Sequence, residues 1–383
     1  MPDGPEGATG APRRREDALR RAGASGDVLA ELVRYDVPLL ERPVAAAQAV
    51  ASLSDEPHLE AWTLYASEAL RDGAIAALAR RFPQLHFPIR AGISGEEEYR
   101  AATRRGVWPA APAGGLGLRD PGSVRLTIHS ALVGKIPLLV VPERLDFESL
   151  VRAFACRNEP VPIPASMGAC IVTGFNNWDR IGRYRDRWAR ANPDGDWSEE
   201  FEWLKARPSL YEDRFILLST GYYSGIAPDE AGFPGPEWRE RSLAIRREHE
   251  CTHYFTFRIA GRMRNHLLDE VIADYAGLVR TFGAFRDDLA RRFFGLERYP
   301  SYRAGSRLEN YRGTPPLTDA ALVVARRLVH GAIESLARVG GVGGGGDAAL
   351  ASTVVTLASR TLAEIAAPDF TIAPPESGTR EAG

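Results

Sequence analysis

The chain has few cysteines, no long apolar run and no excess of charge of either sign. Its 383 residues include only three cysteines, Cys156, Cys170 and Cys251, and none of them belongs to a C-x-x-C pair. Cysteines so few and so irregularly spaced exclude a disulfide framework and favour a reducing compartment. We therefore expect a cytoplasmic protein.

The charge balance excludes further classes of function. The 48 basic and 50 acidic residues nearly cancel, and the formal net charge is −2. Such a balance predicts no general attraction to nucleic acid or to an anionic membrane. The longest apolar runs, such as that at 136–141, fall far short of the ~20 residues that span a bilayer. Residues 1–23 also lack the apolar centre of a secretory signal.

The predicted elements, taken in chain order, indicate an α+β protein. Residues 1–27 are expected to form a disordered lead, and residues 371–383 a disordered tail. A mixed α/β region is expected from 28 to 160. Helical patterning up to residue 82 is followed there by two β-rich runs between 124 and 141 and by one more helix.

A second region, the one that carries the metal-binding pattern described below, is expected from 161 to 370. It begins with a link rich in proline and glycine, and one strand is expected over 214–225. Two long helices are expected over 236–260 and 267–282. Two more helical runs lie on either side of the glycine-rich segment 340–346, which is typical of a flexible linker.

One short stretch of this half combines residues that bind metals. His249, Glu250 and His253 form an H-E-x-x-H pattern within "REHECTHYFTF". Pro236 suits the first turn of a helix and Gly261 supplies its end, so the pattern is expected to be helical. Residues four apart share one face of a helix, which places both imidazoles side by side. The stretch thus predicts two of the ligands of a zinc site.

A third ligand is expected on the next helix. If Gly261 is the pivot of a helical hairpin, His253 lies eight residues before it and Glu270 nine residues after it. At ~1.5 Å per residue both lie about 12 to 13 Å from the turn, so Glu270 comes level with His253. Asp274 shares the face of Glu270 and could fix the tautomer of a ligand histidine. Asp269 points about 100° away from that face and is not expected to bind the metal.

The pattern HECTH followed by EVIAD resembles the gluzincin zinc metallopeptidases, over about residues 248–278. The resemblance implies a zincin-like helical hairpin that holds zinc through His249, His253 and Glu270. It also implies that Glu250 is the general base and that Asp274 orients a ligand. The implied substrate is a peptide or protein, and nothing in the resemblance names which one.

The oxyanion formed in such a reaction needs a hydrogen-bond donor. Candidates occur at the strand end before the motif, in the turn between the helices, and in the irregular segment 297–313. They are Tyr222, Tyr223, His266, Tyr302, Arg307 and Tyr311. Cys251 occupies a position of the motif that points away from the ligands, so we expect it to pack as a small hydrophobe.

Other interpretations use the same residues. The two histidines could hydrogen-bond Glu270 and Asp274 without any metal, or the zinc could be purely structural, although structural sites favour four ligands rich in cysteine. The leading interpretation is a zinc-dependent peptidase. The alternative is a non-catalytic binding or regulatory protein that retains the zincin-like hairpin as a scaffold. Glu250 favours the enzyme, because a scaffold needs no base beside its ligand.

Overall fold

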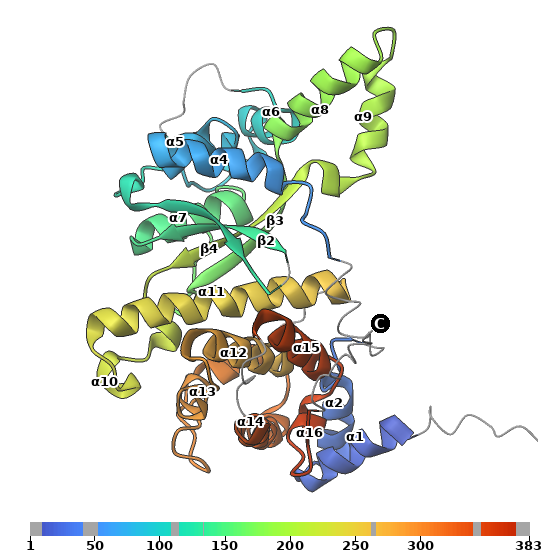
Figure 1. Ribbon diagram of the computed structural model, residues 1–383, viewed down its shortest axis with the longest axis vertical. Helices are drawn as coiled ribbons and strands as arrows, with labels where there is room; N and C mark the ends of the chain where they lie inside the picture. The colour runs from blue at the N-terminus through green and yellow to red at the C-terminus, as the bar shows by residue number, and fades with distance from the viewer. Residues whose placement is uncertain are drawn as a thin grey trace, which may run out of the picture. The chain divides into compact units, whose positions relative to one another are not determined.

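The computed structural model describes residues 10–40, 53–108, 115–132, 134–261, 266–339 and 346–372 (Figure 1). The fold mixes helices with one small sheet, and the chain divides into two compact units. The helical unit joins Met1–Leu53 to Tyr223–Gly383, and the sheet unit is Ser54–Tyr222. This division differs from the boundary expected near residue 160, because one sheet contains strands from both sides of that position.

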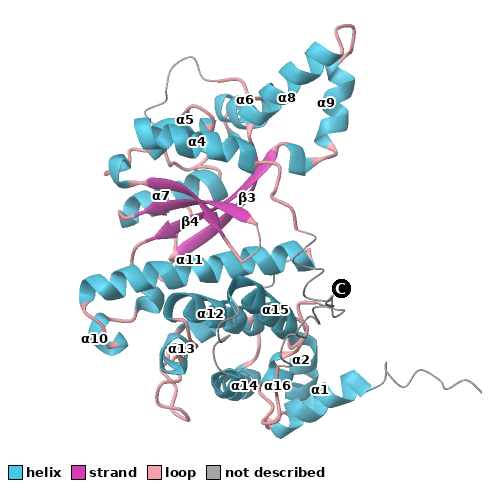
Figure 2. Ribbon diagram, viewed as in Figure 1, coloured by secondary structure: helices cyan, strands magenta, loops and turns pink. Residues whose placement is uncertain are grey.

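The sheet unit is built on four strands in the order β1-β2-β4-β3 (Figure 2). The strands are β1 (Arg125–Ser130), β2 (Lys135–Val141), β3 (Ala169–Asn176) and β4 (Glu212–Ser219). The two β-rich runs form β1 and β2, which pair antiparallel, and β4 runs parallel to β2 and antiparallel to β3. Strand β3 was expected to be a link. An irregularity between Val172 and Phe175 breaks its pairing and its alternation of buried side chains, so its pattern is not that of a regular strand.

An aromatic core covers one face of this sheet. Trp62 of α4 (Leu59–Asp72) and Phe154 of α7 (Arg144–Ala155) both contact Phe215 of β4, with ring centroids 4.9 and 5.0 Å apart. Leu139 and Leu217 are paired neighbours on β2 and β4 and belong to the same core. Alternate residues of a strand share a face, so α4 and α7 pack on the same side of the sheet.

Further helices complete the sheet unit. They are α5 (Ala74–Ala79), η1 (Pro83–His86), η2 (Ile93–Gly95), α6 (Glu97–Arg105), η3 (Pro121–Ser123), α8 (Trp178–Ala191), α9 (Trp197–Lys205) and η4 (Pro208–Leu210).

The described part of the helical unit contains helices and one isolated bridge. Its elements are α1 (Gly10–Arg21), α2 (Gly26–Tyr35), η5 (Tyr223–Gly225), α10 (Pro228–Ala231), α11 (Gly235–Ala260), α12 (Leu267–Phe282), α13 (Asp287–Phe294), η6 (Arg307–Tyr311), α14 (Asp319–Val339), α15 (Gly346–Ala358) and α16 (Leu362–Ile365). Helix α1 lies inside the segment expected to be a disordered lead. The start of that lead (1–9), most of the glycine-rich linker (340–345) and most of the tail (373–383) lie outside the described residues.

Helices α11 and α12 agree with the sequence prediction to within one residue and lie side by side (Figure 1). Gly261 ends α11 in the left-handed conformation, with φ +68°, which glycine adopts without strain. Gly277 lets the helices approach closely, because a Cβ there would lie 3.0 Å from the carbonyl oxygen of Ile245. Tyr35 supplies an acceptor at the start of α12, where the N–H of Leu267 donates to its hydroxyl at 2.9 Å.

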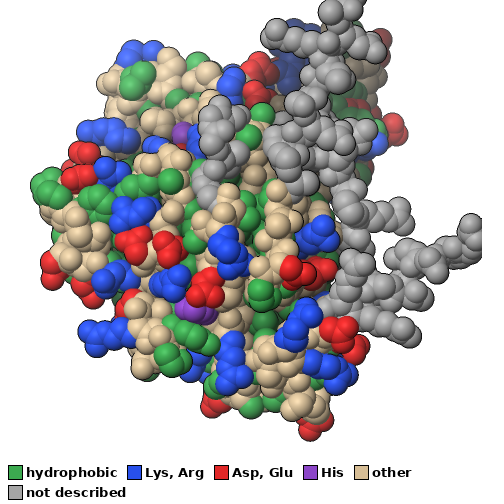
Figure 3. Space-filling view, turned by 60° about the horizontal axis from the view of Figure 1, so that its bottom comes forward, with side chains coloured by type: hydrophobic (Ala, Val, Ile, Leu, Met, Phe, Trp, Pro, Cys, Tyr) green, Lys and Arg blue, Asp and Glu red, His purple; other side chains and the backbone are tan. Residues whose placement is uncertain are grey.

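Two features of the exterior follow the composition. Basic and acidic side chains are interspersed on the face drawn in Figure 3, in keeping with the formal charge of −2. Among the described residues, no helix is both long enough and apolar enough to cross a lipid bilayer.

Candidate metal centre

Three side chains from α11 and α12 direct their ligand atoms to one point. The Nε2 atoms of His249 and His253 are 3.0 Å apart. Glu270 places Oε2 3.5 Å from the first nitrogen and Oε1 3.3 Å from the second. Two atoms that bind zinc tetrahedrally at ~2.1 Å lie about 3.4 Å from each other. The spacing of this cluster therefore suits a metal ion at its centre, and the cluster could hold one.

The register of the two helices produces this convergence. His253 faces Glu270. His249, one turn before His253 on α11, faces Asp274, one turn after Glu270 on α12, as an antiparallel pair of helices requires. Asp269, the neighbour of Glu270, is also buried but does not belong to the cluster. The structure thus brings together the three residues proposed as ligands and the one proposed to orient them.

Protein groups satisfy the cluster only in part. Nδ1 of His249 lies 2.9 Å from Asp274 Oδ1, and an N–H donated there leaves the Nε2 lone pair directed at Nε2 of His253, 3.0 Å away. A proton or a metal ion between the two nitrogens satisfies both of them. Oε2 of Glu270 is buried and makes no hydrogen bond within the described residues, and the guanidinium of Arg307 lies 3.7 Å from it. Buried polar atoms are normally partnered, so these residues fit a bound cation.

The local charges favour a positive centre. Glu270 and His249 are 4% and 5% exposed, and His253 is 9% exposed, so water screens them poorly. Burial alone lowers the pKa of His249, but the carboxylates of Asp274 and Glu270 outweigh burial and raise it to about 9. Burial alone would raise the pKa of Glu270, but the two imidazoles hold it well below its usual range. A metal cation would supply the positive charge that these carboxylates stabilise, in place of the proton on His249.

Asp274 is held by a second set of buried groups. Tyr223 donates its hydroxyl to Asp274 Oδ1 at 2.6 Å, and the same hydroxyl lies 2.8 Å from Nδ1 of His249. Arg307 donates to Asp274 Oδ2 and, at 2.7 Å, to the Tyr223 hydroxyl. Burial would raise the pKa of Asp274, but the charge of Arg307 and the hydrogen bond with His249 lower it. The carboxylate is therefore a charged acceptor for the ligand histidine.

The oxyanion candidates occupy different places. Tyr223 and Arg307 lie behind His249, where they hydrogen-bond Asp274, and Arg307 also lies 3.7 Å from Glu270 Oε2. The backbone carbonyl of Tyr311 accepts a hydrogen bond from Tyr35. Tyr302 accepts a hydrogen bond from Ser306 instead.

The two remaining candidates also have other surroundings. His266 stacks on Tyr35 with ring centroids 4.4 Å apart, and Tyr222 belongs to the sheet unit. Of the six candidates, Tyr223 and Arg307 thus contact Asp274, and both do so through hydrogen bonds that are already made.

Glu250 differs from its neighbours on α11. It is half-buried and makes no hydrogen bond or ion pair with any described residue. Glu248, in contrast, is paired with Arg247 and Arg280. Cys251 is 1% exposed, and burial raises the pKa of its thiol, as expected of a core side chain. Glu250 therefore has a free carboxylate beside the first histidine.

Tyr35 lies near the centre and is not predicted from the sequence to belong to it. The hydroxyl of Tyr35 donates to the carbonyl of Tyr311 at 2.6 Å, besides accepting from Leu267. It thereby ties α2 to α12, which carries Glu270, and to η6, at separations of 232 and 276 residues in the sequence. A single tyrosine at a helix end carries no local signal of such a role.

The fold and the cluster define an α+β protein with two histidines and one carboxylate that could bind a metal. The chain belongs to DUF7005, a family of unknown function, whose model matches residues 17–369. No curated protein and no solved structure matches the chain.

Proposed function

We propose that this protein is a zinc-dependent hydrolase that cleaves an amide bond, with a peptide or protein as substrate. The observation that carries the proposal is the convergence of His249 Nε2, His253 Nε2 and the Glu270 carboxylate within 4.8 Å of one another. Two nitrogens and one oxygen are a donor set that zinc accepts, and they leave a fourth position open, as catalytic zinc sites do. A reducing cytoplasm is part of the proposal, and all three cysteines are free.

The residues around the centre have different roles in this proposal. His249, His253 and Glu270 would hold the ion, and Asp274 keeps His249 in the tautomer whose Nε2 can bind. When bound, zinc polarises a carbonyl oxygen and lowers the pKa of water. Glu250 is the base in this scheme: it takes a proton from the attacking water and returns it to the leaving amine. Its half-buried position and lack of a partner in the described chain suit that role.

Metal content is the first test. The full chain, purified without added zinc, should contain about one zinc per molecule by mass spectrometry of the metal. The His249→Ala/His253→Ala variant should contain none, because it loses two of the three ligands. Stoichiometric zinc in the folded double variant would contradict the assignment of the site.

Cleavage of a diverse peptide library is the second test. Glu250→Gln keeps the size of the side chain and removes the base, so it should retain zinc and lose ~10²–10⁴-fold in rate. Glu240→Gln is the matched control, because Glu240 is exposed on the same helix and makes no hydrogen bond or ion pair with a described residue. Equal cleavage by wild type and Glu250→Gln would place the activity elsewhere. Absence of cleavage by wild type with zinc bound would favour the non-catalytic scaffold.

A further inference from the structure

A polar cavity of about 410 Å³ lies in the sheet unit, between η1, α6, the end of α7 and β3. Its polar lining residues include Gln84, Thr103, Arg104, Arg157, Thr173 and Asn176. Phe154 and Phe175 contribute an apolar wall and are 6% and 9% exposed. The cavity is large enough for a small organic molecule.

Two arginines at this cavity have no hydrogen-bonding or ion-pairing partner among the described residues. Within the described residues, neither Arg104 nor Arg157 makes an ion pair or a hydrogen bond, and both are exposed. Their charges still reach the lining: burial raises the pKa of Tyr99, and the positive charges of Arg157 and Arg104 oppose that rise. The nearby acid Glu159 accepts the N–H groups of Gly92 and Ser94, both at 2.9 Å, and pairs with neither arginine. The cavity therefore has an excess of positive charge.

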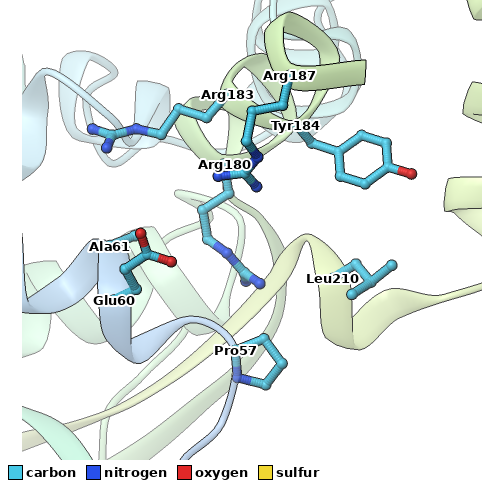
Figure 4. Close-up of a pocket in the computed structure, with 8 residues that line it drawn as sticks. All are labelled: Pro57, Glu60, Ala61, Arg180, Arg183, Tyr184, Arg187 and Leu210. Carbon is cyan, nitrogen blue, oxygen red and sulfur yellow. The ribbon is translucent and has the colours of Figure 1, made fainter. Parts of the chain in front are cut away.

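A second hollow of the same unit shows what a neutralised site looks like (Figure 4). It is lined by Arg180, Arg183 and Arg187, but the first is ion-paired with Asp213 and the second with Asp179. Arg187 makes no ion pair with a described residue, and Glu60 adds a carboxylate to the same wall. Arginines and carboxylates are therefore balanced in this hollow, whereas the larger cavity is lined by two arginines and, among the described residues, by no carboxylate.

A buried amide in the cavity wall also lacks a partner. Gln84 is 6% exposed, and its side chain makes no hydrogen bond with any described residue. The side chains of Asn176 and Thr173 are similarly free within the described chain. These donors and acceptors are available to a ligand.

The backbone around the cavity has positive φ angles at two consecutive non-glycine residues and an irregularity in β3. Arg157 and Asn158 are consecutive non-glycine residues with φ of +54° and +60°. Asn158 is fixed there by its amide, which donates to the carbonyls of Gln84 and Phe87, each at 3.0 Å. Gly174, with φ +73°, lies in the irregularity of β3 on the opposite wall. Strained backbone and strand irregularities concentrate at binding sites.

We infer that this cavity is a binding site for a small organic anion, in which Arg104 and Arg157 contact a phosphate or carboxylate group and the amide of Gln84 binds a polar group of the same molecule. Phe154 and Phe175 face its apolar part. The site belongs to the sheet unit and does not depend on the proposed hydrolase activity.

Calorimetric titration of the full chain with phenyl phosphate, benzoate and phenol tests the inference. Either anion should bind, and phenol should bind at least roughly tenfold more weakly, because it lacks the charge that the arginines recognise. The comparison of the two anions identifies the preferred acid group. Raising the salt concentration should weaken anion binding. Failure of both anions to bind, or equal binding of phenol, would overturn the inference.

Variants locate the site. Arg104→Gln/Arg157→Gln should reduce anion affinity by roughly tenfold to a hundredfold, since hydrogen bonds to charged groups are the strong ones. The control Arg71→Gln/Arg119→Gln removes the same charge from exposed positions outside the cavity and should keep wild-type affinity.

Gln84→Met provides an independent check. It retains the shape of the side chain, and its circular dichroism spectrum should match that of wild type. Anion affinity should fall by about tenfold, because one hydrogen bond is lost. Wild-type affinity in both the folded arginine variant and Gln84→Met would show that the anion binds elsewhere.

Discussion

The imidazole of His249 has a separate partner for each ring nitrogen. Nδ1 faces Asp274 at 2.9 Å, and Nε2 faces the other two ligand atoms. The first contact decides the second, because a proton held on Nδ1 leaves Nε2 free to bind a cation. Arg307 keeps Asp274 charged in its buried position. The affinity of the centre for metal should therefore depend on residues that never touch the ion.

Replacing Asp274 tests this dependence. Asp274→Asn removes the charge that orients His249 and should lower zinc affinity by roughly 10–100-fold, the usual effect of losing an outer partner. Competition with a chelator would measure the change. Asp288→Asn is the matched control, because Asp288 is exposed and its ion pair among the described residues is with Arg286. Equal zinc affinity in the two variants would mean that Asp274 plays no part in positioning His249.

The two adjacent acids of α12 give a sharper comparison. Glu270→Gln removes a ligand and should weaken zinc binding by more than the roughly 10–100-fold expected for an outer partner. Asp269 is equally buried, at 4% exposed, but lies outside the cluster, so Asp269→Asn should leave the affinity nearly unchanged. The reverse order of affinities would show that the register of α12 differs from the one described.

Side chains close in sequence could be placed from the sequence, and those far apart could not. His249 and His253 share a helix face because of the helical period, and the glycine turn brings Glu270 opposite them. The partners of Asp274 could not be predicted from the sequence. Arg307 and Tyr223 belong to η6 and η5, whose positions depend on the packing of the whole helical unit. The sequence therefore offers both only as candidate oxyanion donors, and their hydrogen bonds to Asp274 emerge from the structure.

The contact between α11 and α12 depends on one missing side chain. At Gly277 a Cβ would lie 3.0 Å from the carbonyl oxygen of Ile245 and 3.5 Å from the backbone nitrogen of His249. Both atoms belong to the backbone of α11 and cannot rotate away. Any side chain at this position would push the helices apart beside a ligand.

Gly277→Ala should therefore destabilise the helical unit by about 1–3 kcal/mol, the usual cost of overpacking, and should also weaken zinc binding. Gly182→Ala in α8 is the control, because a Cβ there meets nothing within 4 Å. That change should stabilise the protein by roughly 0.5–1 kcal/mol, since alanine is the better helix former. Urea unfolding measures the free energy of unfolding of both variants. A stabilising effect of Gly277→Ala would show that α11 and α12 have space for a Cβ between them.

Elements with strong end signals were predictable. Pro236 and Gly261 mark the two ends of α11, and the apolar period of α12 leaves little choice of boundaries. Strand β3 was missed because its irregularity hides the alternation that identifies a strand. Its pairing with β4 is a long-range contact, which a local pattern does not record.

The helical unit is closed by a contact between the two ends of the chain. Asp36, which follows α2, accepts the N–H groups of Leu362 and Ala363 at 2.7 and 3.1 Å. The carboxyl group is 3% exposed, and burial raises its pKa from 3.8 to about 6 despite these hydrogen bonds. The folded protein therefore binds a proton at Asp36 more tightly than the unfolded chain does.

The sign of the pH effect follows from this difference. Stability from Asp36 is fully present below pH 3.8 and is lost as the pH rises through about 6. The free energy of unfolding of wild type, minus that of Asp36→Asn, should fall by on the order of 3 kcal/mol between pH 4 and pH 7. Urea unfolding across this range provides the measurement. A difference that stays constant with pH would show that Asp36 titrates alike in both states.

The division into units was not evident from the sequence. Composition suggested a boundary near residue 160, where proline and glycine gather. The structure instead groups Ser54–Tyr222, because β4 completes a sheet begun by β1 and β2. The first 53 residues join the helical unit through contacts such as that of Asp36, which no local pattern reveals.

This discontinuity has a consequence for synthesis on the ribosome. The partners of Asp36 are made 326 residues after it, which at ~5–20 residues per second is roughly 15–65 s later. During that time the apolar side chains of Leu29 and Leu32 on α2 have no completed core to cover them. The sheet unit is one continuous segment and can fold in the interval. The nascent chain should therefore carry a folded middle and an exposed apolar N-terminal helix, which is the kind of segment that chaperones bind.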